Sequence, residues 1–368
     1  MALTLNSPLH VLEDSGIPAG STDFTTVVIL HGFTWHSGIF TKLLPLAHPH
    51  NARIVLVNRR DYLGSKPYTE DDRALLPDLS PEEWADAGQV AAAGEKMKAF
   101  MKERAHEVHD LLVELVRGGN VVVADREKNT GGIVVAGWSL GGSWMTALLA
   151  HVATFPTEEV KLSDYVRRVV IFDSPFLALG YPRPEPALYS PLLDPEIAPE
   201  DRQPLFMKWV SGYFPYGGTP DTLEGKTPLQ DPPPTISTLT SEEIARMTCL
   251  PVGEPGGSDE ILVHSGIRLG LFAYLRERAL YHPEDEKVVA GGDAWRDVEV
   301  RCVTGEWSLA GVLWATMLLK QELEDAKVKG LSTRNVRFVL IRRANHFVQW
   351  DAPELALRSL LGKEDVFE

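Results

Sequence analysis

Short, almost uninterrupted runs of apolar residues recur along the chain and alternate with longer amphipathic segments. Apolar runs rich in β-branched residues are typical of parallel strands that are covered on both faces. The clearest helical segment runs from Ser80 to about Val116 and begins with an N-cap serine, a proline and a capping-box glutamate. The predicted strands are Thr25–Leu30, Arg53–Asn58, Gly132–Ala136, Val166–Phe172, Val298–Val303 and Val336–Ile341.

Strands that alternate with helices predict an α/β fold with a doubly wound, mostly parallel sheet. The alternation is interrupted, because residues 182–234 contain 13 of the 26 prolines and cannot supply central strands. The same segment carries more large aromatic side chains than a linker does. Residues 175–290 are therefore predicted to be an inserted, largely helical and proline-rich domain. Residues 1–174 and 291–368 would then form the core domain.

Composition and charge narrow the classes of function. The 368 residues include 51 acidic and 36 basic side chains, so the net charge is −15. A surface this negative repels phosphate backbones and anionic lipids, which predicts no nucleic-acid partner and no membrane partner. The two cysteines, Cys249 and Cys302, cannot form a disulfide framework, and no signal peptide is visible. We therefore expect a cytoplasmic protein, while the oligomeric state stays open.

The strongest chemical motif is the sequence Gly-Trp-Ser-Leu-Gly at residues 137–141, directly after a predicted strand and before a predicted helix. In this context the motif is a nucleophile elbow, in which Ser139 occupies a sharp turn between strand and helix. The strained turn requires small neighbours two residues away on each side, and Gly137 and Gly141 meet that need. The helix N-terminus behind Ser139 also favours negative charge that develops on a substrate oxygen.

A second motif, His31-Gly32-Phe33, follows the strand Thr25–Leu30. Tetrahedral intermediates need two hydrogen-bond donors on their oxygen. The backbone amides of Phe33 and Leu140 are the two candidates for this oxyanion hole. The side chain of His31 is expected to brace the loop.

The candidate general base is His346, in a loop after the last predicted strand. Such a loop can deliver an imidazole to the carboxyl edge of the sheet, where Ser139 is expected. With Ser139 before His346, on a sheet interrupted by an insertion, the chain resembles the α/β-hydrolase superfamily with a cap domain. The resemblance covers the core, and it implies an α/β-hydrolase fold with a serine, histidine and acid triad.

The acid departs from the family pattern. The family usually places an aspartate three residues after a glycine at the end of the penultimate strand, where this sequence has Ser308. Asp173 follows the strand Val166–Phe172, and some lipases and lactonases of the superfamily carry their acid there. Glu306 lies two residues from the vacant position and has a longer reach. Asp173 is preferred, with Glu306 as the alternative.

The expected substrate is a hydrophobic small molecule, because aromatic side chains gather in the cap and beside the elbow. Serine at the elbow favours hydrolysis of an ester or lactone through an acyl-enzyme. Carbon–carbon bond cleavage, acyl transfer or lyase chemistry are alternatives, and so is a non-catalytic binding protein. No motif for a nucleotide cofactor or a metal is present, so none of either is expected. The candidate substrate contacts are His36, Trp138, Trp209, Tyr213 and Phe214. The alternative for each aromatic side chain of the insertion is a place in a small core of the insertion itself.

Overall fold

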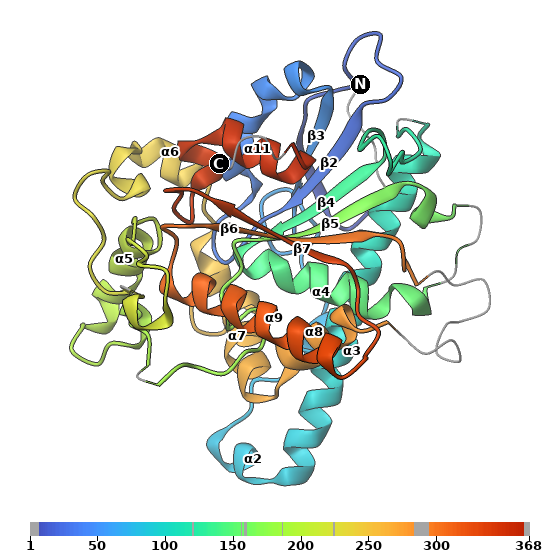
Figure 1. Ribbon diagram of the computed structural model, residues 1–368. Coiled ribbons are helices and arrows are strands. Elements are labelled where there is room, and N and C mark those ends of the chain that lie inside the picture. The colour runs from blue at the N-terminus through green and yellow to red at the C-terminus, as the bar shows by residue number, and fades with distance from the viewer. Residues whose placement is uncertain are drawn as a thin grey trace.

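Seven strands form a mixed sheet in the order β1-β3-β2-β4-β5-β6-β7 (Figure 1). The computed structural model describes residues 7–363 except 120, 156, 158–159, 186, 224 and 283–293. The pair β1–β3 is antiparallel and the other five strand pairs are parallel, which confirms the predicted doubly wound, mostly parallel sheet. The strands are β1 (His10–Asp14), β2 (Thr25–Leu30), β3 (Ala52–Asn58), β4 (Ile133–Trp138), β5 (Val166–Phe172), β6 (Glu299–Gly305) and β7 (Val336–Ile341).

Helices cover both faces of this sheet: α3 (Ala87–Arg117), α4 (Gly142–His151), α8 (Leu271–Leu280) and α9 (Ala310–Val328) on one, α11 (Pro353–Leu361) on the other. Successive strand residues point to opposite faces, so each strand supplies two separate cores. On β2, Val28 and Leu30 pack in the cluster under α3, α4 and α8. Val27 and Ile29 pack instead in the cluster under α11 and the 3-10 helix Ser37–Leu46. Both faces of the sheet are thus covered and buried.

Parallel pairing brings the carboxyl ends of the strands to one edge of the sheet. The register pairs Trp138, the last residue of β4, with Phe172, the last residue of β5. The residues that follow them, Ser139 and Asp173, therefore start neighbouring loops. Ligands of doubly wound folds bind at this edge.

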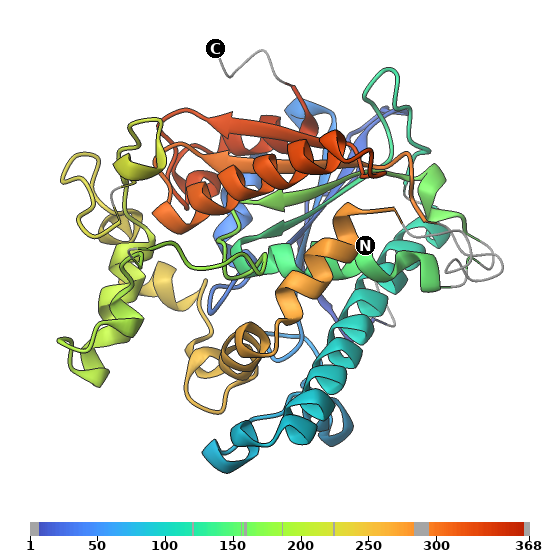
Figure 2. The ribbon, with the colours of Figure 1, turned by 60° about the horizontal axis from the view of Figure 1, so that its bottom comes forward.

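The predicted helix from Ser80 to about Val116 is in fact two helices, α2 (Pro81–Ala85) and α3. Asp86 separates them because its backbone is extended, with ψ of 113°. Its carboxylate accepts hydrogen bonds from the amides two and three residues further on and so caps α3. Figure 2 shows α2 and the first turns of α3 extending away from the sheet.

The predicted insertion contributes to two places. The helices α5 (Pro199–Val210), α6 (Ser241–Ala245) and α7 (Ser258–Arg268) belong to it, and the amide of Phe214, after α5, donates to the carbonyl of Trp307, after β6. That part therefore contacts the carboxyl edge. In contrast, α8 packs against α4 and α3 within the helix layer. The predicted end of the insertion, between residues 290 and 291, lies outside the described residues.

Among the described residues, no helix has the length and apolar character that crossing a membrane requires.

Candidate active site

Ser139 lies at a tight turn between β4 and α4. Its φ is 55°, in the left-handed region that residues other than glycine rarely adopt. A Cβ on Gly137 would lie 2.1 Å from the carbonyl oxygen of Gly141, and one on Gly141 would lie 2.7 Å from that of His31. The two glycines of the motif are therefore required by close backbone contacts. Ser139 stays partly exposed at the start of the helix, whereas Leu140 is buried.

The imidazole of His346 contacts a carboxylate at the end of β5. Its Nδ1 lies 2.5 Å from Oδ2 of Asp173, and both residues are 1 % exposed. The indole Nε1 of Trp138 donates to the carbonyl oxygen of His346 at 2.9 Å, and the two rings are 4.8 Å apart between centroids. The histidine loop is thus held against the residue that precedes Ser139.

Asp173 itself sits at a strained position, with φ of 51°. Besides His346, its carboxylate accepts a hydrogen bond from the amide of Gly305 at 2.7 Å and one from the hydroxyl of Ser308 at 2.5 Å. Ser308 occupies the place where the family pattern has an aspartate. The hydroxyl there donates to Asp173, which follows the neighbouring strand β5.

Glu306 has different partners. One oxygen lies 2.9 Å from Nη1 of Arg342, and the other accepts the amide of Arg343 at 2.9 Å. The structure therefore brings Asp173 to His346 and leaves Glu306 in an ion pair with Arg342.

The loop after β2 lies directly beside the serine. A Cβ on Gly32 would be 2.8 Å from the Cβ of Ser139, which explains why this position has no side chain. Phe33 follows, and then Thr34 turns the chain with φ of 58°. The two candidate oxyanion-hole residues therefore adjoin the serine in different ways, since Phe33 follows the glycine that lies against Ser139 and Leu140 follows Ser139 itself.

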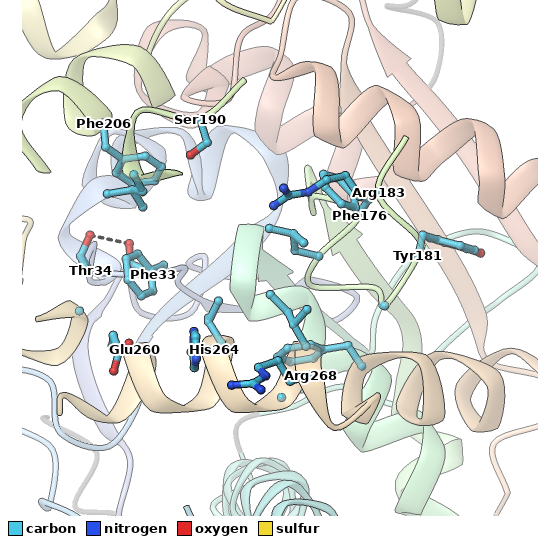
Figure 3. Close-up of a pocket in the computed structure, with 18 of the residues that line it drawn as sticks. Phe33, Thr34, Phe176, Tyr181, Arg183, Ser190, Phe206, Glu260, His264 and Arg268 are labelled. Carbon is cyan, nitrogen blue, oxygen red and sulfur yellow. Dashed lines mark hydrogen bonds between the residues drawn. The ribbon is translucent and has the colours of Figure 1, made fainter. Parts of the chain in front are cut away.

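A cavity of about 1050 Å³ begins at this loop (Figure 3). Phe33 and Phe206 meet edge to face on one side of it, with ring centroids 6.5 Å apart. Phe176 lies on the opposite side, and α7 forms the floor with Glu260, His264 and Arg268 (Figure 3). Further apolar walls come from Leu177, Leu192, Val263, Ile267 and Phe272.

The five side chains predicted to contact substrate lie elsewhere in the described structure, and the residues lining this cavity are others. Trp138 and Phe214 are 1 % exposed within the second hydrophobic cluster. Trp209 donates to the carbonyl of Gly225, and the hydroxyl of Tyr213 donates to Asp351. Packing among the residues of the insertion and the last helices therefore occupies these aromatic side chains.

His36 caps a helix. Its Nδ1 accepts the amide of Gly38 at 3.1 Å at the start of the 3-10 helix Ser37–Leu46, and the residue is 2 % exposed. Burial lowers the pKa of His36 to about 4. The neutral ring is therefore the form that the fold requires.

One cluster of possible metal ligands occurs in the described part of the chain. His106, His109 and Asp110 on α3 have ligand atoms within 4.8 Å of one another. The ring of His106 stacks on Phe155, beyond the end of α4 that lies away from Ser139. The cluster is separate from the candidate active site.

The sheet order, the serine turn after β4 and the histidine loop after β7 together define the α/β-hydrolase class of fold. The model of the alpha/beta hydrolase family matches residues 27–358, and the chain belongs to this family. Comparison with curated protein sequences gives no match.

Three solved structures illustrate the likeness of the chain to others. A candidate aryl esterase from Burkholderia cenocepacia is 14 % identical, with a TM-score of 0.48 and coverage of 98 % of this chain and 97 % of that one. A laboratory-evolved variant of potato epoxide hydrolase is 13 % identical (TM-score 0.45, coverage 96 % and 98 %). A bromoperoxidase from Bacillus anthracis is 14 % identical (TM-score 0.44, coverage 95 % and 94 %). Likeness at this level shows the fold alone.

The titration of His36 generates a prediction about stability. The folded state holds this ring neutral, whereas in the unfolded chain it takes a proton near pH 6.5. Its contribution is complete above pH 6.5 and is lost as the pH falls toward 4. Asparagine in His36→Asn can still accept the capping hydrogen bond, but it does not titrate. The fall in the free energy of unfolding between neutral and acid pH should therefore be smaller by roughly 1–3 kcal/mol.

Urea unfolding at pH 7 and at pH 4.5 measures this difference. His48→Asn is the matched control, because His48 is exposed in the same segment. Equal pH dependence in wild type and His36→Asn would contradict the prediction.

Proposed function

We propose that this protein is a serine hydrolase that cleaves an ester or lactone bond of a hydrophobic small molecule. The contact between His346 Nδ1 and Asp173 Oδ2, beside the strained turn of Ser139, carries the proposal. A proton on Nδ1 that faces the carboxylate leaves Nε2 free to accept one. This is the arrangement that a general base needs.

In the first half of the reaction, Nε2 of His346 takes the hydroxyl proton of Ser139 as Oγ attacks the substrate carbonyl carbon. Asp173 orients the ring and stabilises its positive charge. The amides of Phe33 and Leu140 donate to the oxyanion that forms. Because the site is already folded around these donors, little reorganisation is needed as charge develops.

The first half ends when the tetrahedral intermediate collapses to the acyl-enzyme and His346 gives its proton to the leaving alkoxide. A water molecule then attacks the acyl-enzyme, with Nε2 again accepting a proton. A second tetrahedral intermediate forms and collapses, His346 returns this proton to Oγ of Ser139, and the acid is released.

The cavity that begins at Phe33 supports a bulky substrate. Aromatic and aliphatic side chains form most of its walls, and apolar walls of this extent favour a hydrophobic acyl or alcohol group. Its volume of about 1050 Å³ exceeds the needs of an acetyl group. We therefore propose that large esters are preferred over acetate esters.

Replacement of the nucleophile is the first test. Ser139→Ala should lower turnover of p-nitrophenyl esters on the order of 10⁴-fold or more, because no other group can form the acyl-enzyme. The thermal midpoint should stay close to that of wild type. Turnover in ¹⁸O-labelled water should place the label in the product acid, whereas acyl transfer to an alcohol would give a new ester without the label. Undiminished turnover by Ser139→Ala would end the proposal.

The two carboxylates can be compared directly. Asp173→Asn should lower kcat on the order of 10³-fold, since an amide neither stabilises the imidazolium nor selects the tautomer of His346. Glu306→Gln should leave kcat within about threefold, because Glu306 contacts Arg342 and the amide of Arg343. Steady-state kinetics on one ester measures both. A larger loss for Glu306→Gln would reverse the assignment.

Filling the cavity should change the substrate preference. Val263→Trp adds a large ring to the cavity wall on α7, so kcat/KM for decanoate or larger esters should fall about tenfold or more relative to acetate esters. Val328→Trp is the matched control, because Val328 at the end of α9 is 86 % exposed. An unchanged ratio in Val263→Trp would exclude this cavity as the acyl site.

A further inference from the structure

A buried ion pair links the loop after β3 with the first turn of α7. Arg59 donates to both carboxylate oxygens of Asp259, at 2.9 and 2.7 Å, and the two side chains are 1 % and 5 % exposed. The partners are 200 residues apart in the sequence. A two-point contact of this kind fixes orientation as well as distance.

The same guanidinium reaches the loop beside Ser139. Nη2 of Arg59 donates to the carbonyl oxygen of Gly32 at 2.8 Å. Nε2 of His31 accepts the backbone amide of Arg59 at 3.0 Å, so the ring proton is on Nδ1, which lies 3.1 Å from the same carbonyl. Burial, together with the charge of Arg59, holds the pKa of His31 well below its usual range, so the ring stays neutral. Two donors thus hold the Gly32 carbonyl.

That carbonyl shares a peptide plane with the amide of Phe33. In a trans peptide, C=O and N–H point in opposite directions. A carbonyl held toward Arg59 therefore aims the Phe33 N–H away from Arg59. A Cβ on Gly32 would lie 2.8 Å from the Cβ of Ser139, so this peptide is next to the serine side chain.

Tyr62 holds the next peptide. Its hydroxyl accepts the amide of Thr34 at 3.0 Å and Nη2 of Arg59 at 3.1 Å, and it donates to Oδ2 of Asp259 at 2.5 Å. Burial and the adjacent Asp259 raise the pKa of Tyr62 well above its usual range, so the hydroxyl keeps its proton. Thr34 has φ of 58°, which is strained for a β-branched residue and persists only when its surroundings hold it. Both peptides that flank Phe33 are therefore fixed by one buried group of side chains.

We propose that Arg59, Tyr62 and Asp259 are positioning residues that orient the Phe33 amide toward the oxyanion of the intermediate. This inference rests on the proposed function, and it adds that the insertion helix α7 supplies part of the oxyanion-hole support. The three residues act through the backbone of Gly32 and Thr34. They need no contact with substrate.

The test uses the full chain with Tyr62→Phe and Asp259→Asn, assayed on the ester that wild type hydrolyses fastest. Each variant should lower kcat about 10- to 100-fold, somewhat less than the removal of an oxyanion donor, with KM within about threefold. Inhibition by an alkyl trifluoromethyl ketone, whose serine adduct carries an oxyanion, should weaken by the same factor as kcat/KM.

Glu299→Gln is the matched control. Glu299 pairs with Arg168 at 2.8 Å, and it lies at the amino-terminal end of β6, the edge of the sheet away from Ser139. This variant also breaks a largely buried ion pair, yet it should keep wild-type kcat and wild-type inhibition by the ketone.

The outcomes separate the two proposals. If Ser139→Ala is inactive while Tyr62→Phe and Asp259→Asn keep wild-type kcat and ketone inhibition, the positioning inference is wrong and the hydrolase proposal stands. If Glu299→Gln loses as much kcat as they do, general destabilisation explains the loss, and the inference is again wrong. Wild-type turnover by Ser139→Ala would instead overturn the proposed function itself.

Discussion

The buried carboxylate of Asp173 is the constraint on which the geometry of the site depends. A charge removed from water costs several kcal/mol unless donors surround it. The donors here come from three places in the chain, namely the amide of Gly305, the hydroxyl of Ser308 and the ring of His346. The ends of β5 and β6 and the loop after β7 must therefore meet at one point. A shift of any one of them would remove one of the three partners of the carboxylate.

A second constraint is steric, and it is the reason that so much of the site could be predicted. The tight turn at Ser139 tolerates only glycine at Gly137 and Gly141, because backbone atoms lie where their side chains would be. Such a requirement leaves a local pattern in the sequence. The buried strands leave another, since dry faces demand continuous apolar runs. Both signals lie within a few consecutive residues, which is why six of the seven strands were predicted to within two residues at each end.

Features set by distant contacts could not be predicted in the same way. The edge strand β1 was missed, because its residues are only partly buried and show no continuous apolar run. For the aromatic side chains of the insertion, the sequence left open whether they contact substrate or form a core of their own. Tyr213 and Trp209 bond to Asp351 and to the backbone of Gly225, which favours the second interpretation. Composition predicts that aromatic side chains are buried, but it does not predict which residues they contact. The hydrogen bond from Ser308 to Asp173 could likewise not be predicted, because it depends on the pairing of β6 with β5.

The helix α7 both contacts the side chains that hold the loop beside Ser139 and lines the cavity. Asp259 in its first turn anchors the helix beneath the loop of Gly32, and Val263 and Ile267, four and eight residues later, line the cavity. Residues at this spacing lie along one face of a helix that rises about 1.5 Å per residue. The distance from the anchor to each wall residue is therefore set by helix geometry and not by loop conformation. Substitutions beyond the first turn can therefore reshape the cavity while the contacts of Asp259 with the side chains that hold the loop beside Ser139 stay in place.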